Sequence, residues 1–570
     1  MLKKAAIVVA ILAVILMLLM RFFLAPLIKN KLIDAVSSGS AGVYRLDIRG
    51  VYCNPITGFA SFKDIRLYTD TVLLEKQRTE HPEKPVSLIN LNIRRLVLTD
   101  ARFYSSWSTK VVDLGNITVF DPVVEMYTRL DSLVLSDTLE VSFRERLPQM
   151  LCERVKSLSI KSFTVDNGSF VLGKTDSRNR TTEQSADTIN CLLDSIFVDK
   201  NAQIAAAKKD IEVKGEENRQ AGGPKALYAQ AIRFDFKNYK FKTSKSPYVF
   251  AVGSGDFSSR DELAKLSSVS AGPDISDEEF VRRQKFRRGR FRLSINSILI
   301  VRIDLFKALH RGIWTMQTVD MNQGKVDVYV DKSLEQVPDK RMPNELIRNL
   351  NFYLRADSIF ARNVDIVYHE KKPDGKGVIT FDQAYLKITN FTNDSLLMSD
   401  AHPALIDANC RLMNAGKLVV SIKLPLLSRD FACSFRATLS AMSMLALNPL
   451  FEKDNLIIES GDLKSVQLQA KVQNGKASGA LEAMYDGLEV TVIEAKGTEK
   501  KHLLSSIANL LLRTKNKKDE SGPIRTGTID YTRIAGDDFL RFLWRSARSG
   551  LLDILLPKGV KVPLPPDHPG

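Results

Sequence analysis

The 570-residue chain has few of the residues on which most enzyme motifs depend. Its six histidines and five cysteines are scattered, with no C-x-x-C pair and no H-E-x-x-H motif, so the sequence offers no recognisable zinc or redox centre. The G-x-S-x-G, G-x-x-x-x-G-K-[ST] and post-strand G-x-G-x-x-G patterns of hydrolases and nucleotide-binding proteins are absent too. We therefore expect a protein that is not an enzyme and that needs neither a metal nor another cofactor.

Glycine, proline and cysteine are also too few for several structural classes. Thirty glycines and 21 prolines exclude a collagen-like or proline-rich chain. Five cysteines in this length exclude a disulfide-dense scaffold, and an odd number cannot all pair within one chain. The simplest role for each is that of a small buried apolar residue, although one long-range disulfide stays open. They are Cys53, Cys152, Cys191, Cys410 and Cys433.

A single long apolar run begins near the N-terminus. Ala5–Met20 carries no charge, and the apolar sequence resumes after Arg21 and continues to Ile28. As a helix it can cross about 30 Å of hydrocarbon. The alternative is a cleaved signal peptide, but the run is longer than a usual signal core and the small-residue cluster comes only at 37–42. We expect an uncleaved anchor over residues 1–30, whose flanking charges do not settle its orientation.

Positive charge exceeds negative charge, with 82 Lys and Arg against 66 Asp and Glu. Such an excess allows anionic partners, namely lipid headgroups or nucleic acid, and the membrane anchor makes nucleic acid the poorer choice. A dense basic cluster occupies 282–292. It is either a solvated helix face or a contact for anionic headgroups, for which Arg287, Arg288 and Arg290 are the candidate residues.

Alternation of apolar and polar residues dominates the chain after the anchor, most clearly over 417–492. This period of two predicts strands with one apolar and one polar face, and hence a mainly β fold arranged as an antiparallel meander. The pairs Asn474-Gly475 and Asp486-Gly487 are expected at hairpin turns. The candidate residues of the apolar face are Leu418, Val420, Ile422, Phe431, Phe435, Val466, Leu468, Val472, Val326, Val328 and Val330.

A strand-like pattern with the same apolar spacing recurs along the chain. The copies begin near Leu91, Leu158, Leu227, Leu293 and Leu354, and the copy at Leu227 is weaker. Chance similarity among alternating strands is the alternative to true repetition. Taken as a repeat, the pattern predicts that residues 31–500 form an elongated, curved strand array. Polar loops are expected at 201–224 and 252–273, and a charged helix at 274–292.

The last segment, 501–570, is expected to be helical and amphipathic. One helix is predicted over His502–Arg513, and a second begins at Asp537 or Asp538 and continues to Leu556. The second helix has an apolar stripe interleaved with arginines. It either caps the strand array or lies on a membrane surface, where Trp544 and Arg545 are the candidate contacts.

Three segments carry a resemblance to a known family. They are Leu46–Asp70, with Asn54, Pro55, Thr57 and Gly58 between two strand-like stretches, the repeats above, and the C-terminal Gly527–Leu556. Together they resemble the AsmA-like family of bacterial envelope proteins, in the form found in Bacteroidota. The resemblance implies an inner-membrane anchor, a periplasmic β-groove, phospholipid as the ligand carried between inner and outer membranes, and contact with the outer membrane or one of its proteins at the C-terminal end.

A groove of this kind has a simple physical purpose. An acyl chain in water exposes about fourteen to sixteen methylenes at roughly 0.8 kcal/mol each, or about 12 kcal/mol, which an apolar trough largely removes. Two alternatives stay open. A scaffold that assists outer-membrane protein assembly without carrying lipid would have its apolar face sealed, and a hydrolase would need a converging polar pocket that the sequence does not show.

Overall fold

The computed structural model describes residues 25–54, 56–80, 86–101, 111–129, 157–176, 178–199, 229–335, 337, 339–372, 375–452, 456–492, 513–518 and 524–556. The chain divides into two compact units, Met1–Leu266 (unit 1) and Ser267–Gly570 (unit 2). Each unit is considered by itself below.

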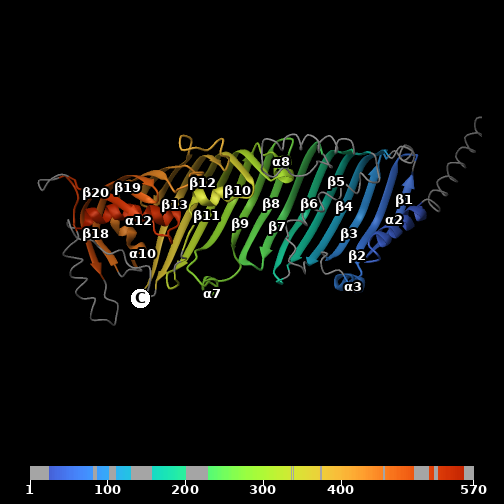
Figure 1. Ribbon diagram of the computed structural model, residues 1–570, viewed down its shortest axis with the longest axis horizontal. Coiled ribbons are helices and arrows are strands. Elements are labelled where there is room, and N and C mark those ends of the chain that lie inside the picture. The colour runs from blue at the N-terminus through green and yellow to red at the C-terminus, as the bar shows by residue number, and fades with distance from the viewer. Residues whose placement is uncertain are drawn as a thin grey trace, which may run out of the picture. The chain divides into compact units, whose positions relative to one another are not determined.

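The prediction of a mainly β fold is confirmed. Among the described residues, twenty strands belong to one mostly antiparallel sheet and helices are few. Figure 1 shows the strands side by side. Unit 1 contains α2 (Ala25–Gly39), β1 (Tyr44–Asn54), β2 (Phe59–Thr69), α3 (Thr71–Glu80), β3 (Val86–Thr99), β4 (Val111–Arg129), β5 (Ser157–Thr175), β6 (Thr181–Asp199), β7 (Ala231–Thr243) and β8 (Ser246–Ser258).

Unit 2 begins within β9 (Leu263–Pro273) and, like unit 1, consists mainly of strands with a few helices. Its elements are α7 (Asp277–Arg282), β10 (Arg290–Val301), α8 (Leu305–Arg311), β11 (Ile313–Asp331), α9 (Pro343–Arg348), β12 (Tyr353–Lys372), β13 (Gly375–Thr392), β14 (Ala404–Leu412), β15 (Gly416–Leu424), β16 (Cys433–Leu439), β17 (Met442–Ser443), the 3₁₀ helix η2 (Met444–Leu447), α10 (Asn448–Phe451), β18 (Leu456–Gln473), β19 (Lys476–Val492), β20 (Thr526–Thr532) and α12 (Phe539–Leu555).

Each unit contains one parallel strand pair among antiparallel ones, β4 with β5 and β11 with β12. The pairs have matching registers. Leu91 lies opposite Val124 and Val124 opposite Phe170 in unit 1, and the residues in the corresponding places of unit 2 are Leu293, Val326 and Ile366. The two units therefore share a four-strand plan, β3–β6 in one and β10–β13 in the other.

The irregularities of the two copies match as well. In unit 1 the β5–β6 pairing shifts register between Val165 and Phe170, and in unit 2 the β12–β13 pairing shifts between Ala361 and Ile366. Asn167 and Asn363 lie within these shifts, and both have a φ of 54°. A left-handed residue at a β-bulge increases the local twist, so both copies twist at the same point of the strand.

Two turn predictions had opposite outcomes. The turn at Asn474-Gly475 is confirmed, because it joins β18 to β19 with φ values of 50° and 74°, as a type I′ hairpin turn requires. The prediction of a hairpin turn at Asp486-Gly487 is wrong. Gly487, with a φ of 64°, lies inside β19, where the β18–β19 register is irregular, so the pair forms a bulge rather than a chain reversal.

Two other predicted segments also require correction. The polar loop at 252–273 is instead the end of β8 and all of β9, whose Val252, Ala264 and Val269 are buried. Small Ser and Gly residues hide this alternation in the sequence. The charged helix at 274–292 is only the six-residue α7, with Ser276 as its N-cap, and the chain has returned to a strand by Arg290.

Several predictions lie outside the described residues. They are residues 1–24 of the anchor, the loop at 201–224, all but Arg513 of the helix His502–Arg513, the start of the repeat at Leu227, Cys152 and the tail after Leu556. Within the described ranges, no helix combines the length and the apolar character needed to cross a membrane. The four cysteines in those ranges are free, and Cys53 and Cys433 are buried as small apolar side chains.

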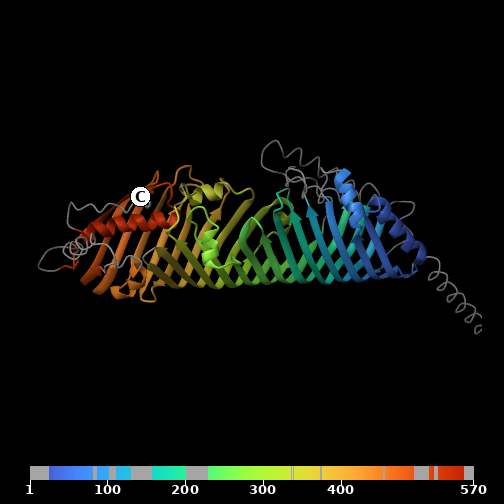
Figure 2. The same ribbon diagram turned by 90° about the horizontal axis from the view of Figure 1, so that it is seen from below.

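The main hydrophobic core lies in unit 2, between the sheet and α12. The α12 helix crosses β19 and β20 (Figure 2) and buries Phe542 and Ile554 against them. The predicted helix start is confirmed at Asp538, whose carboxylate accepts a hydrogen bond of 3.0 Å from the Arg541 backbone N–H. Gly527 of β20 lies so close to Gly550 of α12 that a Cβ on Gly527 would overlap the Gly550 carbonyl oxygen.

Gly527→Val should weaken the docking of α12. The new side chain has no space between β20 and the helix, so we expect a loss of about 1–3 kcal/mol in the free energy of unfolding. Urea unfolding followed by Trp544 fluorescence, in a chain whose other tryptophans are Phe, measures it. Gly39→Ala, where a Cβ meets nothing within 4 Å, is the control. Equal stability of the two variants would contradict the close contact.

Candidate functional site

One face of unit 1 carries unbroken rows of apolar side chains that run across the strands. Residues directly opposite each other on neighbouring strands share a face of the sheet, so the strand register defines each row. The longest row runs through Val51, Phe62, Leu96, Val119, Val165, Cys191, Phe234 and Phe257, one residue from each of β1 to β8. The opposite face is more polar, as at Val123, which lies between Asn92 and Ser169.

Unit 2 has rows of the same kind. One passes through Ile300, Val319, Ile359, Ile388, Ile406, Ile422, Phe435, Ala470, Gly479 and Ile529, from β10 to β20. The alternation of each strand therefore becomes an apolar surface that extends from strand to strand within the unit. We call this surface, in each unit, the apolar face.

The apolar face of unit 2 is sealed towards its C-terminal strands. A large cluster of buried residues extends from Met342 to Ile554 and includes side chains of β14–β16, β18–β20 and α12. Phe431, for example, packs edge-on against Phe539 and Phe542, with ring centroids 6.0 and 5.6 Å apart. Here the chain covers its own apolar surface.

The face over β3–β8 and β10–β12 differs. The buried cluster found among the described residues of unit 1 consists of Val43 and the α3 residue Leu74, and the one residue of β3–β8 that packs against it there is Leu88. The row residues of β3–β8 are mostly half-buried by their neighbours, as in the stacked rings of Phe234 and Phe257, 4.4 Å apart. Phe291, on the apolar face of unit 2, is 52% exposed. Among the described residues this part of the face has no large buried cluster over it, and we call it the accessible part.

The predicted lining residues divide between these two regions. Val326 and Val328 lie half-buried on the accessible part of the face, while Val330, on the same strand, is buried. Leu418, Val420, Val466 and Leu468 share the face but pack against the sealed cluster. Four other predicted lining residues are at most 8% exposed because they belong to the buried cluster beneath α12. The prediction that they line an open groove is wrong; they are Ile422, Phe431, Phe435 and Val472.

The unit 1 rows were not among the predicted lining residues. Phe163, Phe170 and Phe234 alternate with polar residues as clearly as the residues of 417–492 do. The repeats beginning at Leu91 and Leu158 mark β3 and β5, so the signal that would have found them was the repeat itself.

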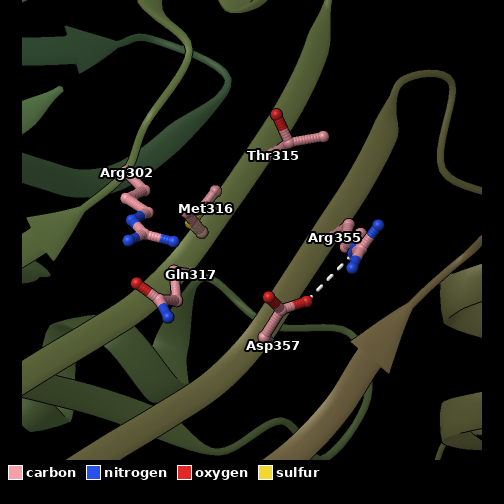
Figure 3. A pocket seen from close by; sticks show the side chains of 6 residues that line it. All are labelled: Arg302, Thr315, Met316, Gln317, Arg355 and Asp357. Carbon is pink, nitrogen blue, oxygen red and sulfur yellow. Dashed lines mark hydrogen bonds and ion pairs between the residues drawn. The ribbon is translucent and has the colours of Figure 1, made fainter.

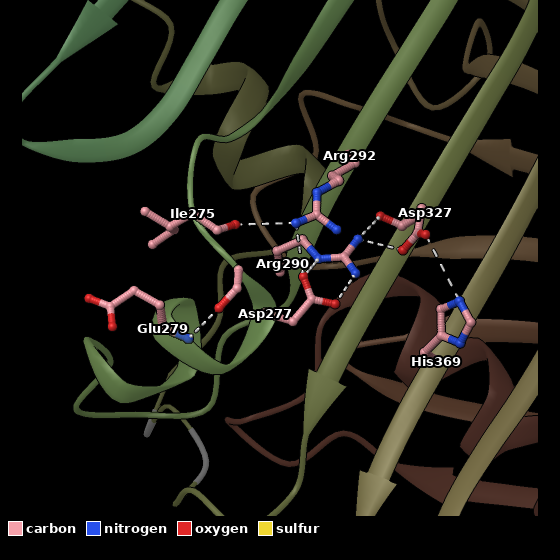
Figure 4. Close-up of polar contacts among 8 residues, drawn as sticks. Ile275, Asp277, Glu279, Arg290, Arg292, Asp327 and His369 are labelled. Atoms are coloured by element: carbon pink, nitrogen blue, oxygen red, sulfur yellow. Dashed lines mark hydrogen bonds and ion pairs between the residues drawn. The ribbon is translucent and has the colours of Figure 1, made fainter.

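Two arginines of the basic cluster, Arg287 and Arg290, are buried, contrary to the headgroup contact predicted for them. The other cations of the cluster are exposed, namely Arg282, Arg283, Lys285, Arg288 and Arg292. Arg290 is 2% exposed and donates to Asp277 at 2.9 and 2.6 Å and to the Asp327 carbonyl oxygen at 3.1 Å (Figure 4). It also pairs with the Asp327 carboxylate. Burial lowers the pKa of Arg290, but hydrogen bonds to the two aspartates outweigh it and leave the pKa above its usual value.

The other candidate cations lie in three different settings. Arg287, 5% exposed, donates to the carbonyl oxygens of Leu334 and Lys332, each at 2.9 Å, so it too is a structural residue. Arg288 is exposed and stays a candidate for headgroup contact. Arg545 points inward, with Nη1 3.1 Å from an Asp537 carboxylate oxygen, which removes it from the predicted membrane contact.

Two of the cavities among the described residues lie near the β10–β12 region, and charged and polar side chains line both. The larger, about 300 Å³, adjoins the Arg290 cluster and is lined by side chains of both signs, including Glu278, His369 and Lys376. The smaller, about 180 Å³, is lined by Arg302, Thr315, Met316, Gln317, Arg355 and Asp357 (Figure 3). There Arg355 is already bound to Asp357 at 2.9 Å.

In the described ranges, no group of three or more His, Cys, Asp or Glu side chains lies close enough together to hold a metal ion. Comparison of the sequence with protein-family models and with curated proteins gave no match. The apolar face is thus the most extensive feature with a capacity to bind, and its chemistry suits a long apolar ligand.

Arg290→Met should destabilise unit 2 strongly. It leaves Asp277 and Asp327 without their buried partner, and breaking a buried ion pair from one side costs about 3–5 kcal/mol. Chemical denaturation followed by circular dichroism measures the change. Arg288→Met, at an exposed neighbour, should stay within about 0.5 kcal/mol of the parent. Similar losses in both variants would mean that the cluster does not hold α7 to the sheet.

Alkaline pH should loosen the sealed core. Burial raises the pKa of Tyr485 and of Tyr531 to about 12, and Asp537 adds to the shift at Tyr531. Unfolded tyrosine ionises near pH 10, so the stability linked to these phenols is complete below pH 10 and is lost as the pH rises towards 12. Thermal unfolding across this range, with tyrosinate absorbance as the second readout, measures it. Tyr485→Phe should reduce the slope, and an unchanged slope would contradict the assignment.

Proposed function

We propose that the chain binds the acyl chains of phospholipids on its apolar face and moves them between the inner and outer membranes of a bacterial cell. The observation that carries this proposal is the accessible part of the face, where the described residues place no large buried cluster over successive rows of apolar side chains. In this proposal residues 1–30 anchor the chain in the inner membrane, and the bulk of the chain lies in the periplasm.

Covering the apolar face with lipid is energetically more favourable than leaving the face exposed to water. Apolar surface in water costs roughly 25 cal/mol per Å², so a face of this kind is expensive unless something covers it. A lipid acyl chain is a flexible apolar rod that can cover a long, narrow strip, and its headgroup stays in water. The polar opposite face, with residues such as Asn92 and Ser169, keeps the sheet itself soluble.

No reacting group is required for this work. Carrying a lipid breaks no covalent bond, so a face without a nucleophile or a metal is sufficient, and we propose a non-enzymatic protein without a cofactor. The resemblance of Leu46–Asp70 and Gly527–Leu556 to AsmA-like proteins supports the same role. Contact with the outer membrane or one of its proteins at the C-terminal end belongs to this proposal as well.

The sealed core beneath α12 favours a second candidate. A scaffold that assists outer-membrane protein assembly without carrying lipid needs an apolar face that the protein itself covers, as the cluster around Phe435 and Phe542 is covered. The same argument does not extend to β3–β8, whose row residues join no such cluster among the described residues. Lipid carriage therefore accounts for more of the molecule.

Two adjacent valines of β4 provide a matched test. Val124 belongs to the apolar face, between Leu91 and Phe170, while Val123 points to the other side and is 40% exposed. Val124→Glu places a charge where an acyl chain would lie, so we expect the phospholipid that co-purifies in mild detergent to fall about tenfold, the effect of roughly 1.4 kcal/mol. Val123→Glu should retain the parental amount. Mass spectrometry of extracted lipid measures both.

Val326→Glu, at the equivalent place in unit 2, repeats the test in the second copy. Circular dichroism checks that each variant is folded. A folded parent chain without any bound phospholipid would overturn lipid carriage and leave the scaffold. Equal lipid in the Val123 and Val124 variants would show that the lipid lies elsewhere.

A further inference from the structure

The α12 helix has a second apolar surface that its own core does not use. Phe542 and Ile554 are buried against the sheet, but Leu540 is 74% and Trp544 is 51% exposed, and neither belongs to the buried cluster. The two are four residues apart, so they lie one above the other on the same side of the helix. They form what we call the outer patch of α12.

Positive charge accompanies this patch. The helix carries three arginines and one acid, Asp553. Arg545 points inward to Asp537, so Arg548 is the arginine on the side of the patch. Asp553 is engaged towards the sheet, since its carboxylate accepts a hydrogen bond of 2.8 Å from the Thr528 backbone N–H. Arg548 follows Trp544 by four residues and therefore lies beside it on the helix surface.

The acids before the helix are also bound. Asp538, at the N-cap, is 2.9 Å from the Lys340 Nζ, and Asp537 is fully buried, with a carboxylate oxygen 3.1 Å from Arg545. These contacts hold α12 at its N-terminal end, and Asp553 holds it near the other end. The outer patch is thus presented on a helix that cannot turn over without breaking them.

We propose that the outer patch of α12 docks on an anionic membrane surface. A helix that lies in the headgroup region of a membrane typically has tryptophan and leucine on one side and arginine beside them. Tryptophan is preferred at this depth, and arginine binds the lipid phosphates. A folded protein partner is less suitable, because a stable interface needs about 800 Å² from each side and two side chains provide far less. The proposal rests on the C-terminal membrane contact of the proposed function and names the surface that makes it, but it does not require lipid carriage.

The test uses the full chain, held by its N-terminal segment in phosphatidylcholine nanodiscs and carrying Trp107→Phe and Trp314→Phe. Vesicles of phosphatidylethanolamine and phosphatidylglycerol are then added. The remaining Trp544 should shift its emission to the blue, and the nanodiscs should float with the vesicles. Leu540→Ser with Trp544→Ser should reduce flotation at least about tenfold, since burying one such side chain is worth roughly 1.5 kcal/mol or more.

The matched control is Leu396→Ser, which removes a leucine that is 85% exposed in another part of unit 2. It should float like the parent. Unchanged flotation of the Leu540/Trp544 double variant, or equal flotation with pure phosphatidylcholine vesicles, would overturn the proposal. Val124→Glu should dock normally, so loss of lipid carriage and loss of docking are separate outcomes. A blue shift that grows with protein concentration in the absence of vesicles would point to a second copy of the chain instead.

Discussion

A sheet that is apolar on one side must have that side covered, and this constraint governs the whole molecule. The alternation of apolar and polar residues leaves each unit with one face that is costly to hydrate. At the C-terminal strands α12 covers it, and the result is an ordinary core around Phe435, Tyr485 and Phe542. Over β3–β8 no comparable cluster forms among the described residues, so the same chemistry has a different consequence there.

The two copies of the four-strand plan show how such a face is extended. A parallel pair, β4–β5 or β11–β12, lies between antiparallel neighbours, and the residues on the face keep their positions across it. Leu91, Val124 and Phe170 correspond to Leu293, Val326 and Ile366, all apolar. On the opposite face the side chains differ more freely, as where Asp113 corresponds to Thr315 and Ser159 to Arg355. The property common to both copies is the apolar face.

Two arginines of the basic cluster, by contrast, have a structural role inside unit 2. The sequence predicts a binding surface for anions here, but Arg290 and Arg287 are buried and donate to aspartates and backbone carbonyls. Burying a guanidinium is costly unless its donors are satisfied, and α7 brings Asp277 into place for this purpose. Arg288 of the same cluster is exposed, so burial separates its structural arginines from its solvent-facing ones.

Local pattern in the sequence determined the strands, the Asn474-Gly475 turn and the cap of α12 at Asp538, because each depends on neighbouring residues alone. Tertiary structure decided what those strands do. Phe435 and Phe163 both lie in stretches where apolar and polar residues alternate. Phe435 is buried in the cluster that includes α12, which follows it by more than one hundred residues, and Phe163 is not in that cluster. Likewise, Arg290 and Arg288 are both arginines and lie two residues apart in the sequence. Arg290 is buried because it pairs with Asp277 and Asp327, whereas Arg288 is exposed. Burial is set by contacts between distant segments, which a period of two does not encode.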